Sequence, residues 1–309
     1  MTYAIVARDP SAGEVGGAVQ THFFNAGAVV LWPEAGTGVI ATMAMAETAY
    51  GRLGLRLLRQ GLSADDALTQ LLKRDSIAAV RQVAVMGVHG APAAHTGESC
   101  ISAAGHRSRR DVVALGNMLA CEGTWDRMTE AFESATGSLA SRLLTGLEAA
   151  EQAGGDIRGR QSAAIVVVKS AADPETGEIG TSGIVPQVDL RVDDSAEPLI
   201  ELRRLLTLDS FYKELLVLLT TPGLFVGPFS STINWSAGAD ALRSGQQLLG
   251  DNQEATFWLA VLLTRAGEMD MARRQMAAAM AIHPPLREFA ARLVPQNMLT
   301  AAQAAALSN

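Results

Sequence analysis

The chain has few cysteines, few aromatic residues and no long hydrophobic run. Its 309 residues include only two cysteines, Cys100 and Cys121, which are too few for a disulfide framework in a chain with ample core. Apolar residues make up 48% of the chain and aromatics only 5%, which is typical of a folded core packed with alanine, leucine and valine. The longest apolar runs, 163–168 and 215–219, are far too short to span a bilayer.

Basic clusters and a leader segment are missing as well. The net charge is -7, and the only basic group, Arg107 with Arg109 and Arg110, is best interpreted as a solvated turn. Binding to phosphates by counterion release needs a basic face, so we expect neither nucleic acid nor an anionic membrane surface as a partner. No charged segment followed by an apolar segment opens the chain, which predicts a cytoplasmic protein.

Histidine is the remaining residue type that suggests a metal site. His22, His89, His95 and His106 show neither a helical i, i+4 pair nor a Cys-x-x-Cys companion. We therefore expect no metal ion and no other cofactor.

What the chain does contain is a regular grouping of strands and helices over its first 200 residues. The predicted strands cover residues 3–8, 14–20, 28–32, 38–43, 81–88, 93–96, 112–118, 162–169, 178–184 and 188–192. The predicted helices cover residues 49–60, 63–74, 124–135 and 139–153, with Ser63 and Thr124 as caps. Helix pairs between groups of strands suit two stacked, largely antiparallel sheets covered by helices. The predicted fold class is therefore α+β, a four-layer α-β-β-α sandwich.

Two turns within this region share one pattern. Asp9-Pro10 precedes Gly13-Glu14, and Asp173-Pro174 precedes Gly177-Glu178 at the same spacing. Proline and glycine at these places are typical of β-hairpins, so we expect the same hairpin chemistry twice.

The C-terminal part is different in character, because strand signals vanish beyond about Asp209. We predict a main domain over residues 1–208, a linker over 209–238 and a small all-α domain over 239–309. Its small and apolar residues have the spacing of one tetratricopeptide unit: Ala260, Leu263, Gly267, Ala272, Ala279 and Pro284. One unit cannot bury its own face, so we expect docking to a protein partner or assembly into a homo-oligomer. A helical hairpin that merely completes a core is an equal alternative.

The opening residues carry the strongest candidate for catalysis. Thr2 follows Met1 and precedes an apolar run over residues 3–7. Removal of Met1, which a small second residue favours, leaves a hydroxyl and a free α-amine on one threonine. An α-amine has a pKa of about 7.7–8, so part of it is neutral and can take the hydroxyl proton. Thr2 is thus a candidate nucleophile, although most chains that begin Met-Thr make no use of the threonine.

Five blocks of sequence support that interpretation: residues 2–10, 27–32, 116–119, 159–164 and 189–194. Over residues 2 to 206 the chain resembles a bacterial family of uncharacterised proteins, domain of unknown function 1028, assigned to the N-terminal-nucleophile hydrolase superfamily. The resemblance implies the sandwich fold, a nucleophile on the opening strand, and hydrolysis of an amide in a small-molecule or peptide-like substrate. Ala4, Met43 and Glu47 depart from the serine, glutamine and asparagine that the family often has.

The resemblance extends to the segment after Asp209, which looks like a C-terminal segment likened to a peptidoglycan-binding domain in some members. A cell-wall fragment is therefore a candidate partner of the helical domain. Trp235 and Trp258 are its only obvious aromatic candidates for binding sugar.

Other polar residues near predicted strand ends complete the candidate site. Asn117 is our first choice as donor to an oxyanion, and its alternative is a bond to loop backbone. Ser162 with Gln161 and Arg160 can orient the amine or bind a substrate carboxylate, whereas strand-end capping is the structural alternative. Thr42 is a weaker candidate as a hydroxyl donor, and a structural role is favoured for it.

Two functions follow from these features. The first is an amidohydrolase in which Thr2 is the nucleophile, its amine is the base, and Asn117 with backbone amides holds the oxyanion. The second is a non-catalytic binding or assembly protein that keeps the same scaffold and docks through its C-terminal helices.

Overall fold

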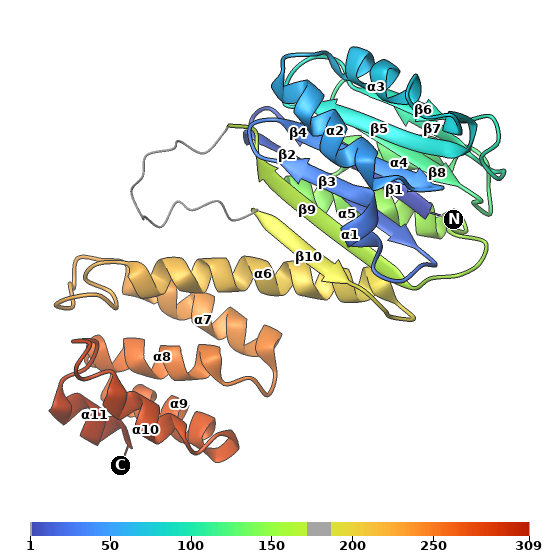
Figure 1. Ribbon diagram of the computed structural model, residues 1–309. Coiled ribbons are helices and arrows are strands. Elements are labelled where there is room, and N and C mark those ends of the chain that lie inside the picture. The colour runs from blue at the N-terminus through green and yellow to red at the C-terminus, as the bar shows by residue number, and fades with distance from the viewer. Residues whose placement is uncertain (1, 172–186, 309) are drawn as a thin grey trace. The chain divides into compact units, whose positions relative to one another are not determined.

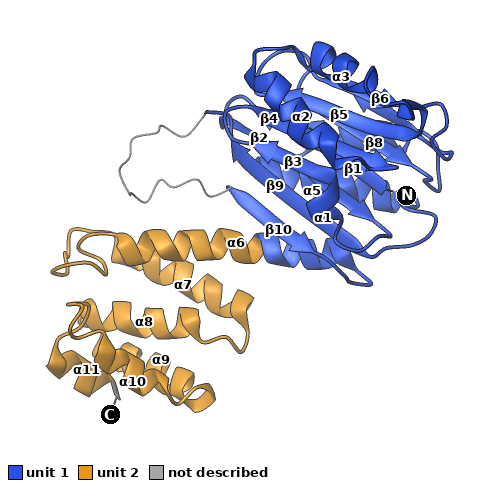
Figure 2. Cartoon of the chain, viewed as in Figure 1, with its two compact units in different colours: residues 1–206 blue, residues 207–309 orange. Residues whose placement is uncertain are grey.

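The computed structural model describes residues 2–171 and 187–308, and the chain divides into two compact units (Figures 1 and 2). Unit 1 covers residues 1–206 and unit 2 covers residues 207–309. The division falls within one helix, α6 (Pro198–Thr220), so residues 209–220 are helical where we predicted the start of a linker. The physical reason is that Phe211 and Leu215 are buried in the core of unit 2 and hold this stretch in place.

The larger sheet of unit 1 opens with the predicted hairpin. Its strands, in the order β10-β9-β2-β1-β8-β7, are β1 (Thr2–Asp9), β2 (Glu14–Thr21), β7 (Gly105–Ser108), β8 (Val112–Asn117), β9 (Ser162–Lys169) and β10 (Val188–Val192). Asp9 pairs with Glu14, and its carboxylate accepts hydrogen bonds from the backbone amides of Ser11 and Ala12. Gly13 closes the turn with φ +63°, a conformation that glycine adopts at little cost.

Two expectations for unit 1 lie outside the described residues, and two others have different outcomes. The second turn of the same pattern, over 173–178, and the strand predicted over 178–184 lie outside the described residues. Arg107, which we placed in a solvated turn, lies in β7 and forms an ion pair with Asp126. Thr124 is the first residue of its helix and not the cap, because Gly123 takes the cap position with φ +72°.

The smaller sheet has the order β3-β4-β5-β6. Its strands are β3 (Leu31–Glu34), β4 (Gly38–Ala44), β5 (Arg81–Gly87) and β6 (Ala93–Thr96). The strand predicted over 28–32 is wrong in its first half, because a short helix, α1 (Ala26–Val30), precedes β3. Gly27 explains the difference: a Cβ there would lie 2.6 Å from the Ala164 side chain, so this backbone packs directly on β9. The valines of α1 suggested a strand, but the contact with β9 decides its conformation.

Three hydrophobic cores hold these sheets and their helices together. On one face of the larger sheet, Tyr3 and Ile5 pack against α4 (Thr124–Ser134) and α5 (Leu139–Gln152). On one face of the smaller sheet, Ile40 packs against α2 (Thr48–Arg59) and α3 (Ala64–Leu72), which is capped by Ser63 as predicted. The third core lies between the two sheets and contains the alternate residues of β1, Ala4 and Val6. The unit is therefore a mixed α+β structure with a packed core between facing sheets.

Unit 2 contains helices only among its described residues. Beyond α6 these are α7 (Trp235–Leu249), α8 (Glu254–Arg265), α9 (Met269–Ile282), α10 (Leu286–Arg292) and α11 (Ala301–Ser308). Residues 255–264 of α8 are buried on every side, as an all-round apolar helix must be. Over residues 2–171 and 187–308, no helix combines the length and apolar character that a bilayer span requires.

Candidate functional site

Four neighbouring strands of the larger sheet end in polar residues on one face, at the end marked N in Figure 1. The register places Asn117 of β8 opposite Thr2 of β1, and Thr21 of β2 opposite Ser162 of β9. The Oγ1 atoms of Thr2 and Thr21 are 3.0 Å apart, which joins the two pairs. Ala4, the next residue of β1 on this face, belongs to the core between the sheets. These four polar residues, named the Thr2 row below, therefore close one end of the space between the sheets.

Thr2 lies at the start of a strand that has neighbours on both sides, and it is only 8% exposed. Thr21, its hydroxyl partner, is a residue that sequence reasoning missed. The signal was available in the hairpin: once Asp9 pairs with Glu14, counting back along both strands brings Thr21 beside Thr2. A hydroxyl can donate one hydrogen bond and accept others, so Thr21 can orient the Thr2 hydroxyl.

Asn117 is fully buried and is held from the smaller sheet by Gln82, a second residue that we did not predict. Gln82 Nε2 donates to the carbonyl oxygens of Gly105 at 3.0 Å and Gly116 at 2.9 Å. Because these acceptors fix the amide nitrogen, Gln82 Oε1 faces the other way and accepts from Asn117 Nδ2 at 3.0 Å. This contact fixes the orientation of the Asn117 amide too.

The consequence is an unpaired acceptor in the site. Asn117 Oδ1 points away from Gln82 and is buried without a hydrogen-bond partner. An unsatisfied buried acceptor costs about 1–3 kcal/mol, so it is unusual in a folded protein. Side chains of directly opposed strand residues lie within about 5 Å of each other, which puts this oxygen within reach of Thr2.

Ser162 belongs to the Thr2 row, but its hydroxyl is occupied by backbone. Its Oγ donates to the Phe23 carbonyl at 2.6 Å and accepts from the Ala26 amide at 3.1 Å. Ser162 therefore fastens the loop between β2 and α1 to the end of β9, and these contacts fit the capping alternative.

Arg160 and Gln161 turn away from the row toward acidic side chains. Arg160 Nε donates to Glu151 Oε1 at 2.6 Å, and a second nitrogen of the same guanidinium pairs with Glu197. Hydrogen bonding to Glu151 raises the pKa of Arg160 further. Gln161 Nε2 donates to Asp194 at 3.2 Å. The structure thus places both residues in polar contacts with acidic side chains at the start of β9.

Thr42 is on the other face of its sheet from the one that looks toward Thr2. Its neighbours Ala41 and Met43 belong to the core between the sheets, so strand alternation directs Thr42 toward the α2 and α3 layer. Its Oγ1 accepts a hydrogen bond from the Glu47 amide at 3.3 Å. The structural role favoured from the sequence agrees with this position.

Asp156 is a further buried acid that sequence reasoning missed. Its carboxylate accepts hydrogen bonds from the backbone amides of His22 at 3.0 Å and Arg158 at 2.9 Å. It thereby ties the loop that follows Thr21 to the loop that precedes β9. No motif marks this residue as part of a site, because its contact with the distant His22 amide cannot be recognised from the local sequence.

A cavity of about 460 Å³ lies next to Gln82. Thr96, which lines it, accepts from Gln82 Nε2 at 2.9 Å, and its hydroxyl is 2.9 Å from Nδ1 of His106. Burial lowers the pKa of His106, and nearby His95 and Arg107 act in the same direction, so the imidazole is neutral at pH 7. In the part of the chain that is described, no group of three or more histidine, cysteine or acidic side chains is placed to hold a metal ion.

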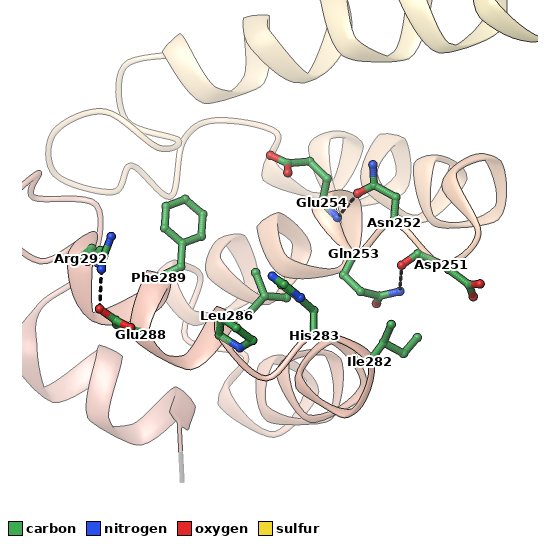
Figure 3. Close-up of a pocket in the computed structure, with 11 residues that line it drawn as sticks. Asp251, Asn252, Gln253, Glu254, Ile282, His283, Leu286, Glu288, Phe289 and Arg292 are labelled. Carbon is green, nitrogen blue, oxygen red and sulfur yellow. Dashed lines mark hydrogen bonds and ion pairs between the residues drawn. The ribbon is translucent and has the colours of Figure 1, made fainter.

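Unit 2 has a pocket of its own, of about 580 Å³ (Figure 3). Its aromatic wall is Phe289, which stacks on Phe257 with ring centroids 4.7 Å apart. Glu254, which also lines the pocket, accepts a hydrogen bond from the indole nitrogen of Trp258 at 2.7 Å. An apolar wall beside polar groups is typical of a small-ligand site.

Comparison with known proteins identifies the family of the chain. The model of the family described as "Family of unknown function (DUF1028)" matches residues 2–202. A crystal structure of protein SPO2555 from Silicibacter pomeroyi, assigned to the same family, is similar with a TM-score of 0.59 and 33% identity. The match covers 68% of this chain and 89% of that one. No curated protein matches this chain. The chain therefore belongs to the DUF1028 family of unknown function.

Proposed function

We propose that this protein is an N-terminal-nucleophile amidohydrolase in which Thr2, exposed by removal of Met1, attacks an amide carbonyl. The observation that carries the proposal is the unpaired Asn117 Oδ1 opposite Thr2. A free α-amine on Thr2 supplies further N–H donors at the place where this buried acceptor lacks one. Facing sheets, each covered by a helix pair on its other side, also suit the four-layer sandwich that the resemblance implies.

The chemistry follows from the positions in the Thr2 row. The neutral α-amine takes the proton of the Thr2 hydroxyl while Oγ1 forms a bond to the substrate carbonyl carbon. Asn117 Oδ1 accepts a hydrogen bond from the amine and so directs its lone pair toward the hydroxyl. Gln82 accepts one of the two Asn117 Nδ2 hydrogens, which leaves the other for the developing oxyanion. The ammonium then protonates the departing amine as the C–N bond breaks, and water hydrolyses the Thr2 ester.

The direct test is to compare one chain with its Thr2 amine blocked and free. In a fusion protein, a carrier protein is joined directly to Thr2 and blocks its amine. We expect this fusion protein to hydrolyse none of a panel of N-acyl 4-nitroanilides. A site-specific protease that cuts directly before Thr2 removes the carrier protein. Hydrolysis should then start, because the amine becomes available as the base. Intact-mass analysis checks that each sample has the intended N-terminus. Equal rates before and after cutting would rule out the amine as base, and inactivity in both would favour the non-catalytic binding role.

A second prediction concerns Asn117, whose side-chain oxygen is the unpaired acceptor. Asn117→Ala should lower kcat/KM about 10²-fold, because the amine loses the group that orients it and the oxyanion loses a donor. Loss of an acceptor also destabilises the ammonium, so the acidic limb of the pH-rate profile should move to lower pH. Ser162→Ala is the matched control. Ser162 lies in the same row, but its hydroxyl bonds only to backbone groups, so the substitution should lower thermal stability and leave kcat/KM unchanged. An unchanged profile for Asn117→Ala would contradict the proposed contact.

A further inference from the structure

Exposed apolar side chains in unit 1 gather at one end of its sheets. Seven large hydrophobic residues are exposed in the described part of this unit, and six of them lie on loops at the Thr2 end. Those six, named the apolar ring below, are Phe23, Phe24, Met45, Ile77, Ile101 and Ile157, with exposed fractions from 50% to 70%. The seventh is Ile200 on α6. Described loops at the opposite end, such as 10–13, 35–37, 88–92 and 109–111, contain none.

Hydrogen bonds to backbone atoms connect the apolar ring to the Thr2 row. The carbonyl of Phe23 accepts the hydrogen bond from Ser162 Oγ. Ile101 and Ile157 both contact Met118, the residue after Asn117: its amide donates to the Ile101 carbonyl at 3.0 Å, and its carbonyl accepts from the Ile157 amide at 3.5 Å. The ring therefore borders the row on the sides of β8 and β9.

The smaller sheet contributes the remaining border. The Met45 amide donates to the Val80 carbonyl at 3.3 Å, and the Met45 carbonyl accepts from the side chain of Arg81, which precedes Gln82. Ile77 lies just before the 3₁₀ turn that leads into β5. Loops from both sheets thus bring apolar side chains to the end of unit 1 at which the Thr2 row lies.

Three arginines at this end are already paired with acidic side chains. Their ion pairs are Arg81 with Asp75 at 2.7 Å, Arg158 with Asp156 at 3.2 Å, and Arg160 with Glu151 at 2.6 Å. A substrate carboxylate bound by one of these arginines would have to break its ion pair, whereas an uncharged chain would not. Exposed apolar groups gathered around polar residues mark a binding surface.

We propose that the apolar ring binds the acyl group of the substrate, and that the substrates are N-acyl amides with a long, uncharged hydrocarbon chain. The inference rests on the proposed function, since it places the scissile carbonyl at Thr2 and the chain across the ring. A second copy of the protein seated on these loops would cover Thr2. An acyl chain instead leaves its carbonyl at the row and buries apolar surface on the ring.

The test measures how rate depends on chain length. With the Met1-free chain, kcat/KM for N-acyl 4-nitroanilides should rise about threefold per added CH₂, or about 10²-fold to 10³-fold from acetyl to octanoyl. Phe23→Ser with Phe24→Ser should flatten this dependence to less than about tenfold. Ile200→Ser is the control, because it removes an equally exposed side chain from α6 and should leave the dependence intact. All three positions are exposed, so the variants should fold.

Binding without turnover separates the two proposals. Isothermal titration should show octanamide binding to the full chain, acetamide failing to bind, and the Phe23/Phe24 variant losing the octanamide signal. If octanamide binds in this way but nothing is hydrolysed, the acyl site stands and the proposed function fails. If hydrolysis needs Thr2 but ignores chain length, the proposed function stands and the acyl site fails. Light scattering that shows a dimer becoming a monomer in the Phe23/Phe24 variant would instead assign the ring to a subunit interface.

Discussion

Replacing Thr2 with alanine should abolish amide hydrolysis, with kcat reduced by at least about 10³-fold. The substitution removes the attacking oxygen but keeps the α-amine, the strand and its two neighbours. Thr2→Ser keeps the nucleophile and should retain measurable activity, so this pair separates chemistry from folding. The measurement is kcat on whichever N-acyl 4-nitroanilide the wild-type chain turns over, together with far-UV circular dichroism.

Two further readouts sharpen the Thr2 experiment. Thr21→Val removes the hydroxyl 3.0 Å from Thr2 Oγ1 but keeps the shape, so it should lower kcat about tenfold while Thr2 remains competent. In the wild-type chain kcat/KM should rise with pH as the α-amine loses its proton, and it should reach half of its plateau near the amine pKa of about 8. Full activity in Thr2→Ala would place the chemistry elsewhere, with His106 beside the 460 Å³ cavity as the next candidate.

Asp75→Ala should lower the free energy of unfolding by about 3–5 kcal/mol, because it leaves the buried guanidinium of Arg81 without its acidic partner. Arg81 Nε and Asp75 Oδ2 are 2.7 Å apart, and their side chains are only 9% and 13% exposed. The same carboxylate accepts from the Tyr50 hydroxyl at 3.1 Å and from the Ile77 amide at 3.0 Å. Urea unfolding at pH 7 measures the loss. Arg59→Ala, which breaks an exposed pair with Glu34, is the control and should cost under about 1 kcal/mol.

The pH dependence of this effect has a defined sign. Burial raises the pKa of Asp75, but hydrogen bonds from Arg81, the Ile77 amide and Tyr50 outweigh it, so the pKa is lowered in the folded chain. A lowered folded-state pKa contributes stability above the unfolded pKa of about 3.9, and this stability is lost as pH falls through the folded value. The difference between wild type and Asp75→Ala should therefore be constant near pH 7 and shrink at pH 3. A difference that grew in acid would contradict the assignment.

Local patterns predicted much of unit 1 because its strands and turns have strong local signals. The Asp9-Pro10 turn, the β9 run and the Ser63 cap depend on neighbouring residues only, and each was located from them. The strand predicted over 28–32 failed because Gly27 packs on a strand more than 130 residues away. Such a contact leaves no mark in the local pattern.

In the site, too, the residues marked by the local sequence were predicted, and those defined by contacts with distant strands were not. Thr2 and Asn117 stood out as polar residues at the ends of apolar strands, and the register brings them together. Gln82 was missed because its value lies in contacts with Gly105 and Gly116, which come from other strands. The face on which Thr42 lies could not be predicted, because a seven-residue apolar strand that is buried on both faces gives no alternation to count.

The position of β1 between β2 and β8 limits the time during which Met1 can be removed. β2 follows β1 within a few residues, but β8 begins about 100 residues later, which at the usual pace of translation is on the order of ten seconds. During that interval the N-terminus is open to an aminopeptidase. Once β8 and Gln82 join, Thr2 is 8% exposed and Asn117 is fully buried. On this account Met1 is removed most readily during synthesis, and chain that keeps Met1 would stay inactive after refolding.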